Sequence, residues 1–237
     1  MIDASTFAAS YNAFWHAHAP TCEHFVRRLN LSGLERFFPP MPPQSARSSR
    51  RAVIAEYAFS LFVERRKALE HSNSEAVLAE LAWQETKKRL APFASQGLDI
   101  ESPLNEEEAE QVNTISGRLG TFFNSSRPIS VRPMFAGCGY VDASEGDVIF
   151  GSTLYEVKTV ERPVRSGDIR QTITYAALNA ASTTSQFKID YVGLFNPRRG
   201  QYCDLDIEYV CSEISGRPAQ ELFGVIVQAL SSGEISR

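Results

Sequence analysis

Residues 146–159 have the sequence GDVIFGSTLYEVKT, which is the most informative stretch of the chain. Gly151-Ser152 is a two-residue turn signal between the apolar run 148–150 and the β-forming run 154–160. Two such runs, separated by two turn residues, predict a β-hairpin.

The hairpin register brings three charged side chains to one face. With the turn at 151–152, Val148 faces Tyr155 and Asp147 lies opposite Glu156, while Lys158 follows two residues later on the same face. Directly opposed side chains have Cβ atoms roughly 4.5–5.5 Å apart. Two opposed carboxylates repel, and a divalent cation between them reverses the sign of that interaction. The pattern is therefore consistent with a metal site beside a lysine, and also with an exposed, charged hairpin.

The next predicted helix adds polar residues to this pattern. Residues 167–179 combine an N-terminal cap candidate, Asp168, with an Ala-rich body. Gln171 and Tyr175 are four residues apart, so a helix places them on one face.

These linked motifs resemble a known nuclease superfamily. Gly-Asp at 146–147, Glu-x-Lys-Thr at 156–159 and Arg-Gln-x-x-x-Tyr at 170–175 are together similar to the PD-(D/E)xK, or restriction-endonuclease-like, nucleases. The Gln-x-x-x-Tyr element is similar to the RecB-like branch, which includes lambda-type exonucleases. The resemblance covers 106–209. One departure is Gly146, which stands where the motif has proline.

The resemblance implies a site for metal-dependent phosphodiester cleavage. Asp147 and Glu156, with the backbone carbonyl of Val157, would hold Mg²⁺ or Mn²⁺. Lys158 would position or activate the attacking water. Asp142 competes with Asp147, because RecB-like proteins often carry Gly-x-x-Asp here. Asp147 is favoured, since it lies where its strand pairs with Glu156.

Helix residues would complete this site. Gln171 would orient the water or the phosphate, and Tyr175 would pack or hydrogen-bond beside it. Family members often place a further acidic residue on the first core helix, and Glu108 is the candidate here. The alternative is that residues 106–110 form a solvated acidic helix start that complements the helix dipole.

The fold expected from the resemblance is α/β (α+β), with a restriction-endonuclease-like core of a helix, three strands, a helix and a strand. Its mixed central sheet would be flanked by helices. The hydrophobic pattern agrees, because it predicts a helix over 105–123 and strands over 130–136, 191–195 and 201–209. We expect a nuclease domain over 101–237, preceded by a helical N-terminal region over 1–100.

The N-terminal region would contact nucleic acid, a protein partner or a second copy of the chain. Helix-compatible spacing covers 5–18, 22–31, 51–71 and 75–90. Its basic clusters are equally consistent with phosphate contacts and with a solvated helix face; they are Arg47/Arg50/Arg51 and Arg65/Arg66/Lys67. A zinc site is not favoured, because the spacing of four residues matches no standard finger: His16, His18, Cys22 and His24.

Three arginines are candidates for phosphate contacts in the nuclease domain. Arg170 precedes Gln171, and Arg198-Arg199 forms a predicted turn at 196–200. For that turn, a merely solubilising role is equally consistent.

Composition is compatible with this interpretation. The chain has 237 residues and is 43% hydrophobic, which suffices for a substantial core. It has no apolar run long enough to span a membrane and no signal-peptide pattern at its start, so we expect a cytoplasmic protein without membrane contact. The four cysteines match neither a disulfide framework nor an iron–sulfur spacing. A net charge of −4 argues against non-specific coating of nucleic acid, and it does not exclude a nuclease with a positive cleft.

The sequence therefore predicts a metal-dependent deoxyribonuclease, acting in phage defence, mobile-element processing or DNA repair. Endonuclease and exonuclease action both stay open, and RNA is not excluded as a substrate. The alternative is a catalytically inactive nuclease fold that binds nucleic acid or assembles into a larger complex.

Overall fold

The computed structural model describes residues 2–43, 45–68, 73–124, 126–184 and 187–232. The fold is mixed α/β, and the chain divides into two compact units. The sheet unit comprises Met1–Phe37, Arg127–Asn196 and Gly200–Arg237, and the helical unit comprises Phe38–Ser126 and Pro197–Arg199.

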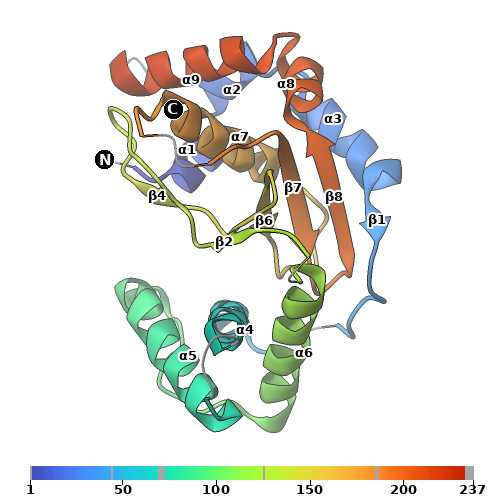
Figure 1. Ribbon diagram of the computed structural model, residues 1–237, viewed down its shortest axis with the longest axis vertical. Helices are drawn as coiled ribbons and strands as arrows, with labels where there is room; N and C mark the ends of the chain where they lie inside the picture. Colours follow the sequence, from blue (N-terminus) through green and yellow to red (C-terminus); the bar gives the residue numbers. More distant parts are fainter. Residues whose placement is uncertain (1, 44, 69–72, 125, 185–186, 233–237) are drawn as a thin grey trace. The chain divides into compact units, whose positions relative to one another are not determined.

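A six-stranded mixed sheet forms the centre of the sheet unit (Figure 1). Strand β6 pairs in parallel with β7, whereas the other neighbouring strands of this sheet pair antiparallel. This confirms the expected mixed sheet flanked by helices. Across the sheet the strands are β1 (Glu35–Arg36), β8 (Gln201–Asp206), β7 (Tyr191–Asn196), β6 (Thr153–Val157), β5 (Val148–Phe150) and β2 (Ile129–Val131). A separate two-stranded sheet consists of β3 (Met134–Phe135) and β4 (Ser144–Glu145).

Strands β5 and β6 form the predicted hairpin in the predicted register. Val148 pairs with Tyr155. Gly151 begins the turn with φ +66°, a left-handed conformation that glycine adopts without a Cβ clash. Leu154 lies in the main apolar core. Because side chains alternate along a strand, Glu156 points to the same face as Leu154.

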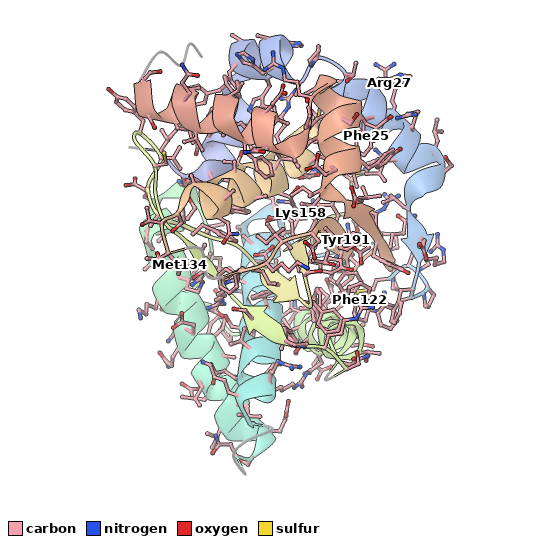
Figure 2. The ribbon with its side chains drawn as sticks, turned by 45° about the horizontal axis from the view of Figure 1, so that its top comes forward. Phe25, Arg27, Phe122, Met134, Lys158 and Tyr191 are labelled. Atoms are coloured by element: carbon pink, nitrogen blue, oxygen red, sulfur yellow. The ribbon has the colours of Figure 1, made fainter. Side chains whose placement is uncertain are left out.

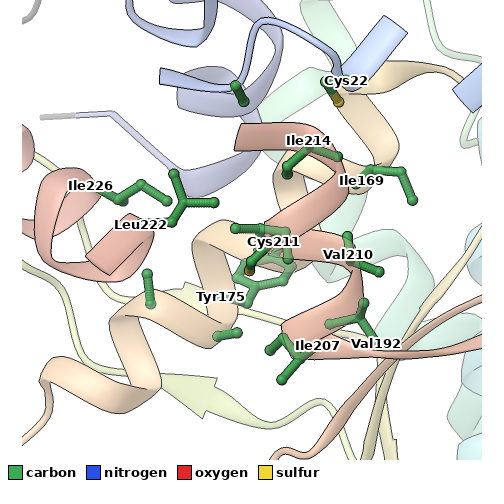
Figure 3. Close-up of a cluster of buried hydrophobic side chains, with 14 of the residues drawn as sticks. Cys22, Ile169, Tyr175, Val192, Ile207, Val210, Cys211, Ile214, Leu222 and Ile226 are labelled. Atoms are coloured by element: carbon green, nitrogen blue, oxygen red, sulfur yellow. The ribbon is translucent and has the colours of Figure 1, made fainter. Parts of the chain in front are cut away.

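Helix α7 (Ser166–Ala181) connects β6 to β7, because parallel neighbours need a crossover connection. The main core gathers around this helix, and both α1 (Ala4–Ser10) and α9 (Ala219–Ser232) pack against it. Figure 3 shows part of this core, including Ile169 and Tyr175 of α7 beside apolar side chains of the C-terminal helices. The remaining helices of the sheet unit are α2 (Asn12–His18), α3 (Cys22–Arg28), the π-helical turn Leu29–Gly33 and α8 (Ile207–Ser215).

The helical unit consists mainly of three helices, α4 (Ser48–Lys67), α5 (Glu75–Leu90) and α6 (Glu106–Phe122), with a 3-10 turn at Ala91–Gln96. Helix α4 packs against both α5 and α6. None of the described helices is long and apolar enough to cross a membrane.

The compact units do not follow the expected boundary between residues 100 and 101. Helices α1 to α3 belong to the sheet unit, where α1 and α3 pack against α7. The helix expected to begin the nuclease core, α6, belongs to the helical unit and packs against α4. Tertiary contacts between segments distant in the sequence cause this division.

Several expected elements are shorter or divided. The helix expected over 5–18 is interrupted at Tyr11, whose ψ of 58° is not helical. The strand expected over 130–136 divides into β2 and β3 around Arg132, which has φ +54°. The strand expected over 201–209 ends at Asp206, because the Asp206 side chain accepts the Tyr209 N–H and caps α8. The end of the helix expected over 51–71 lies partly outside the described residues.

Candidate active site

The open end of the β5–β6 hairpin places Asp147 beside β6. Asp147 directly precedes β5, and its Oδ2 accepts the backbone N–H of Val157 at 2.7 Å. Its carbonyl accepts the Arg132 N–H at 2.8 Å, so the backbone of Asp147 is fixed as well. Asp142 lies outside the named strands, with its N–H bonded to the Ile2 carbonyl. The geometry therefore favours Asp147 over Asp142 as a neighbour of Glu156.

Lys158 joins the strand to helix α7. Its Nζ donates to Glu156 Oε1 at 2.8 Å and to Gln171 Oε1 at 3.1 Å. The backbone N–H of Lys158 donates to the Phe195 carbonyl, which extends the β6–β7 pairing to this residue. Figure 2 marks Lys158 within the sheet unit.

Gln171 and Tyr175 lie on one face of α7, as their spacing predicts. Gln171 Nε2 donates to the Tyr175 hydroxyl oxygen at 2.9 Å. That bond leaves the Tyr175 O–H available as a donor. A continuous chain of hydrogen bonds therefore runs from Glu156 through Lys158 and Gln171 to Tyr175.

Asp168 is a third carboxylate near Lys158, although its position in the sequence predicted only a capping role. Its Oδ1 lies 3.7 Å from Lys158 Nζ. The Arg162 guanidinium donates to both of its oxygens, at 2.7 and 2.8 Å. Because Asp168 precedes Gln171 by three residues, helical spacing was a signal that could have placed it at this site.

The expected cap position was wrong. Helix α7 begins at Ser166, so Asp168 lies within the first turn and not before it. Its Oδ2 accepts the Arg165 N–H at 2.8 Å, which satisfies a backbone donor at the helix start.

The electrostatics keep Lys158 charged. Burial lowers the pKa of Lys158, but Glu156, Asp168 and Asp147 together outweigh burial, so that the pKa is raised. Burial raises the pKa of Tyr175, and the charges of Glu156 and Asp147 raise it further. At neutral pH the site therefore contains an ammonium group and a protonated phenol.

Gly146 is explained by an aromatic stack behind the site. Phe135 of β3 stacks on Tyr175, with ring centroids 5.3 Å apart and an interplanar angle of 21°. A Cβ at Gly146 would lie 2.9 Å from Phe135 Cε2 and 3.6 Å from Leu154 Cδ1. Any side chain at position 146 would therefore displace the ring that supports Tyr175.

The donor set suits a hard divalent cation. Asp147 and Glu156 offer carboxylate oxygens, Val157 offers a carbonyl oxygen, and Mg²⁺ binds such ligands while keeping several waters. The Lys158 ammonium already compensates the charge of Glu156. Within the described part of the chain, no group of three or more His, Cys, Asp or Glu side chains is gathered around a metal position. A carbonyl and waters would therefore complete the coordination sphere.

Glu108 is engaged within the helical unit. It is 6% exposed, and its carboxylate accepts two bonds from the Arg50 guanidinium at 3.0 and 3.2 Å. The same carboxylate accepts the Asn105 N–H, and Asn105 caps Glu108 in return. The alternative of a solvated acidic helix start is wrong for Glu108, because this residue is buried and ion-paired.

Two of the three arginines expected to contact phosphates are buried. Arg170 is 5% exposed, and its guanidinium lies over the Trp15 ring at 5.7 Å. Arg198 is 2% exposed and donates to Gln111 within the helical unit. Buried guanidinium groups offer no surface to a nucleic-acid backbone, so the expectation is corrected for these two residues. Arg199 is partly exposed.

Side chains of the N-terminal basic clusters bind partners within the helical unit. Arg50 pairs with Glu108, Arg65 pairs with Glu75, and Lys67 pairs with Glu64. Arg66 donates to the Phe123 carbonyl at 3.2 Å. These contacts favour a structural helix face for these four side chains.

Cys22 and His18 of the His/Cys segment pack within the sheet unit, whereas His16 and His24 are exposed. Cys22 is buried against the Ser166 carbonyl, and the ring of His18 packs on Phe14 with centroids 4.7 Å apart. Burial raises the pKa of the Cys22 thiol to about 11, so it is protonated at neutral pH. All four cysteines are free thiols.

No protein-family model matches this chain, and a search of curated proteins finds no match. The candidate site therefore has to be judged by its own geometry and chemistry.

Proposed function

We propose that this chain is a divalent-metal-dependent nuclease that hydrolyses phosphodiester bonds of DNA. One observation carries the proposal: Lys158 Nζ bonds Glu156 on the strand and Gln171 on the helix at the same time. A buried carboxylate, an ammonium and an amide are thereby held together beside Asp147. The exposed, charged hairpin that the sequence also allowed would instead leave these groups in solvent.

The order of elements supports the proposal. Strands β2, β5 and β6 pair antiparallel, α7 follows, and β7 then pairs in parallel with β6. Apart from β3 and β4, which lie between β2 and β5 along the chain, this order is compatible with the three strands, helix and strand that the resemblance implies. The helix expected before these strands, α6, lies instead in the helical unit.

In the proposed reaction Asp147, Glu156 and the Val157 carbonyl would hold Mg²⁺ or Mn²⁺. The ion would supply a Lewis acid and lower the pKa of bound water. The charged Lys158 orients a phosphate oxygen and stabilises the negative charge that develops on it. Its raised pKa favours the ammonium form, which acts here through its positive charge.

The two helix residues have distinct tasks in this scheme. Gln171 holds the Lys158 ammonium through its Oε1 and the Tyr175 oxygen through its Nε2. Tyr175 can then donate its O–H to the water or the phosphate. Phe135 keeps the Tyr175 ring in place.

The test is an incubation of the purified chain with linear, circular and single-stranded DNA in Mg²⁺, Mn²⁺ or EDTA. We expect cleavage with either metal and none in EDTA. The choice among the three substrates separates endonuclease from exonuclease action. No cleavage of any substrate, together with retained DNA binding, would select the alternative of an inactive binding or assembly subunit.

A further inference from the structure

The Lys158 ammonium and a bound metal ion would share one carboxylate, that of Glu156. In the structure this ammonium is bonded to Glu156, a carboxylate that would bind the metal. Two cations on one carboxylate repel each other, so the entry of Mg²⁺ would weaken the Lys158–Glu156 bond. Lys158 then needs another anionic partner, or it would oppose metal binding.

Asp168 is placed to be that partner. Its Oδ1 is 3.7 Å from Lys158 Nζ, which is close to the ammonium but longer than a hydrogen bond. A small movement of Nζ away from Glu156 would close this gap, while Gln171 is already bonded to the ammonium at 3.1 Å.

Arg162 and the start of α7 hold Asp168 in position. The Arg162 guanidinium binds both carboxylate oxygens, and the Arg165 N–H binds Oδ2. The side chain of Asp168 is only 6% exposed. A buried carboxylate with this many donors keeps its charge and its place.

We propose that Asp168 is a positioning residue that receives the Lys158 ammonium when a divalent cation occupies Asp147 and Glu156. This inference rests on the proposed metal site. Asp168 itself binds neither metal nor DNA in this scheme. Its negative charge lowers the electrostatic cost of placing a metal ion next to a lysine.

The test measures binding of Mn²⁺ alone to the full chain, by electron paramagnetic resonance of the free ion. Asp168→Gln and Asp168→Glu form a matched pair, because both residues can serve at the third position of a capping box and they differ only in charge. We expect Asp168→Gln to weaken Mn²⁺ binding about tenfold, and Asp168→Glu to bind nearly as the unaltered chain does.

The decisive comparison repeats the measurement in a Lys158→Ala background. In that background there is no Lys158 ammonium for Asp168 to bind, so Asp168→Gln should leave the Mn²⁺ affinity unchanged. Equal weakening in both backgrounds would overturn the proposal, because Asp168 would then act directly on the metal or on the fold. Unchanged affinity with Lys158 present would overturn it as well.

Asp206→Asn is the control for an altered helix start. Asp206 accepts the Tyr209 N–H at 2.9 Å at the start of α8, and we expect this variant to bind Mn²⁺ normally. Absence of Mn²⁺ binding by the unaltered chain would remove both this inference and the proposed function. The predicted coupling without any DNA cleavage would support the inference and remove only the nuclease.

Discussion

Glu156 in the sheet unit and Glu108 in the helical unit are buried to the same degree, since each is 6% exposed. Glu108 is held by Arg50, whose Nη1 also binds the carbonyls of Asp99 and Ser102. We call that pair closed, because the planar Arg50 guanidinium donates hydrogen bonds to both carboxylate oxygens of Glu108. Glu156 is held by Lys158, whose ammonium has further partners within reach.

The difference separates an ion pair that is fixed in one arrangement from an ion pair that can rearrange. Removing one partner of a closed buried pair leaves an uncompensated charge and destabilises the fold. A lysine is a single charge on a flexible stem, so it can move when a second cation arrives. Equal burial therefore does not indicate an equal role.

The largest effect is expected at Lys158. We expect Lys158→Ala to lower the rate of DNA cleavage by about 10²–10⁴-fold, because charge stabilisation in the transition state is lost. Cleavage rates in Mg²⁺ measure this, and circular dichroism verifies the fold. Full activity in the variant would remove Lys158 from the mechanism. Lys67→Ala, in the helical unit, is the control and should cleave normally.

The next effect concerns the closed pair. We expect Arg50→Ala to lower the unfolding free energy of the helical unit by about 3–5 kcal/mol, because Glu108 is left buried without its partner. Trp83 lies in the helical unit and Trp15 in the sheet unit. In a Trp15→Phe background, Trp83 fluorescence during urea denaturation therefore follows the helical unit.

The same variant tests the independence of the two pairs. Mn²⁺ binding should be unchanged in Arg50→Ala under native conditions. A loss of Mn²⁺ binding without unfolding would link the Arg50–Glu108 pair to the metal site, where the resemblance makes Glu108 a candidate.

A smaller effect is expected from adding a methyl group at two glycines. Gly146→Ala forces Phe135 away from Tyr175, and such overpacking costs about 1–3 kcal/mol. We expect a lower melting temperature and slower cleavage. Gly117→Ala lies in α6, where a Cβ meets nothing within 4 Å. Alanine there should stabilise the helix by up to about 1 kcal/mol. If Gly146→Ala changed neither the melting temperature nor the cleavage rate, the stack of Phe135 on Tyr175 would not support the site.

The smallest expected effect is a pH dependence of folding stability that arises from Asp168. Burial raises the pKa of Asp168, but the bonds from Arg162 and Arg165 outweigh burial, and the pKa is lowered overall. The ion pair therefore stabilises the fold above the unfolded pKa of about 3.9 and loses this effect as pH falls through the lower folded pKa.

Comparison with Asp168→Asn measures this contribution. At pH 6 the free energy of unfolding of the unaltered chain should be about 1 kcal/mol higher than that of the variant. In strong acid this difference should vanish. Urea denaturation in a Trp83→Phe background follows the sheet unit through Trp15. A difference that persists at all pH values would point to a packing effect in place of the ion pair.

Local parts of the fold and the site were predictable from the sequence. The register of the hairpin follows from a two-residue turn between apolar runs, and it places Asp147, Glu156 and Lys158 within twelve residues of each other. The contact between Gln171 and Tyr175 follows from the helical repeat. These relations need only short-range geometry, which the order of residues determines.

Other parts depended on contacts between distant segments. Arg170 is buried because Trp15 of α2 covers it, and Arg198 is buried because it binds Gln111 of α6. No local pattern distinguishes such arginines from exposed ones. The division into a sheet unit and a helical unit has the same origin, since α1 packs on α7 across more than 150 residues of sequence.

The order of residues alone was enough to identify the reactive groups of this protein, which are two carboxylates, a lysine, a glutamine and a tyrosine on a hairpin and the following helix. Tertiary packing fixed the contacts between separate elements of the fold. It joined Lys158 to Gln171 and paired Glu108 with Arg50. The physical reason is that pairing energies depend on distance and burial, and both are set only when remote segments pack together.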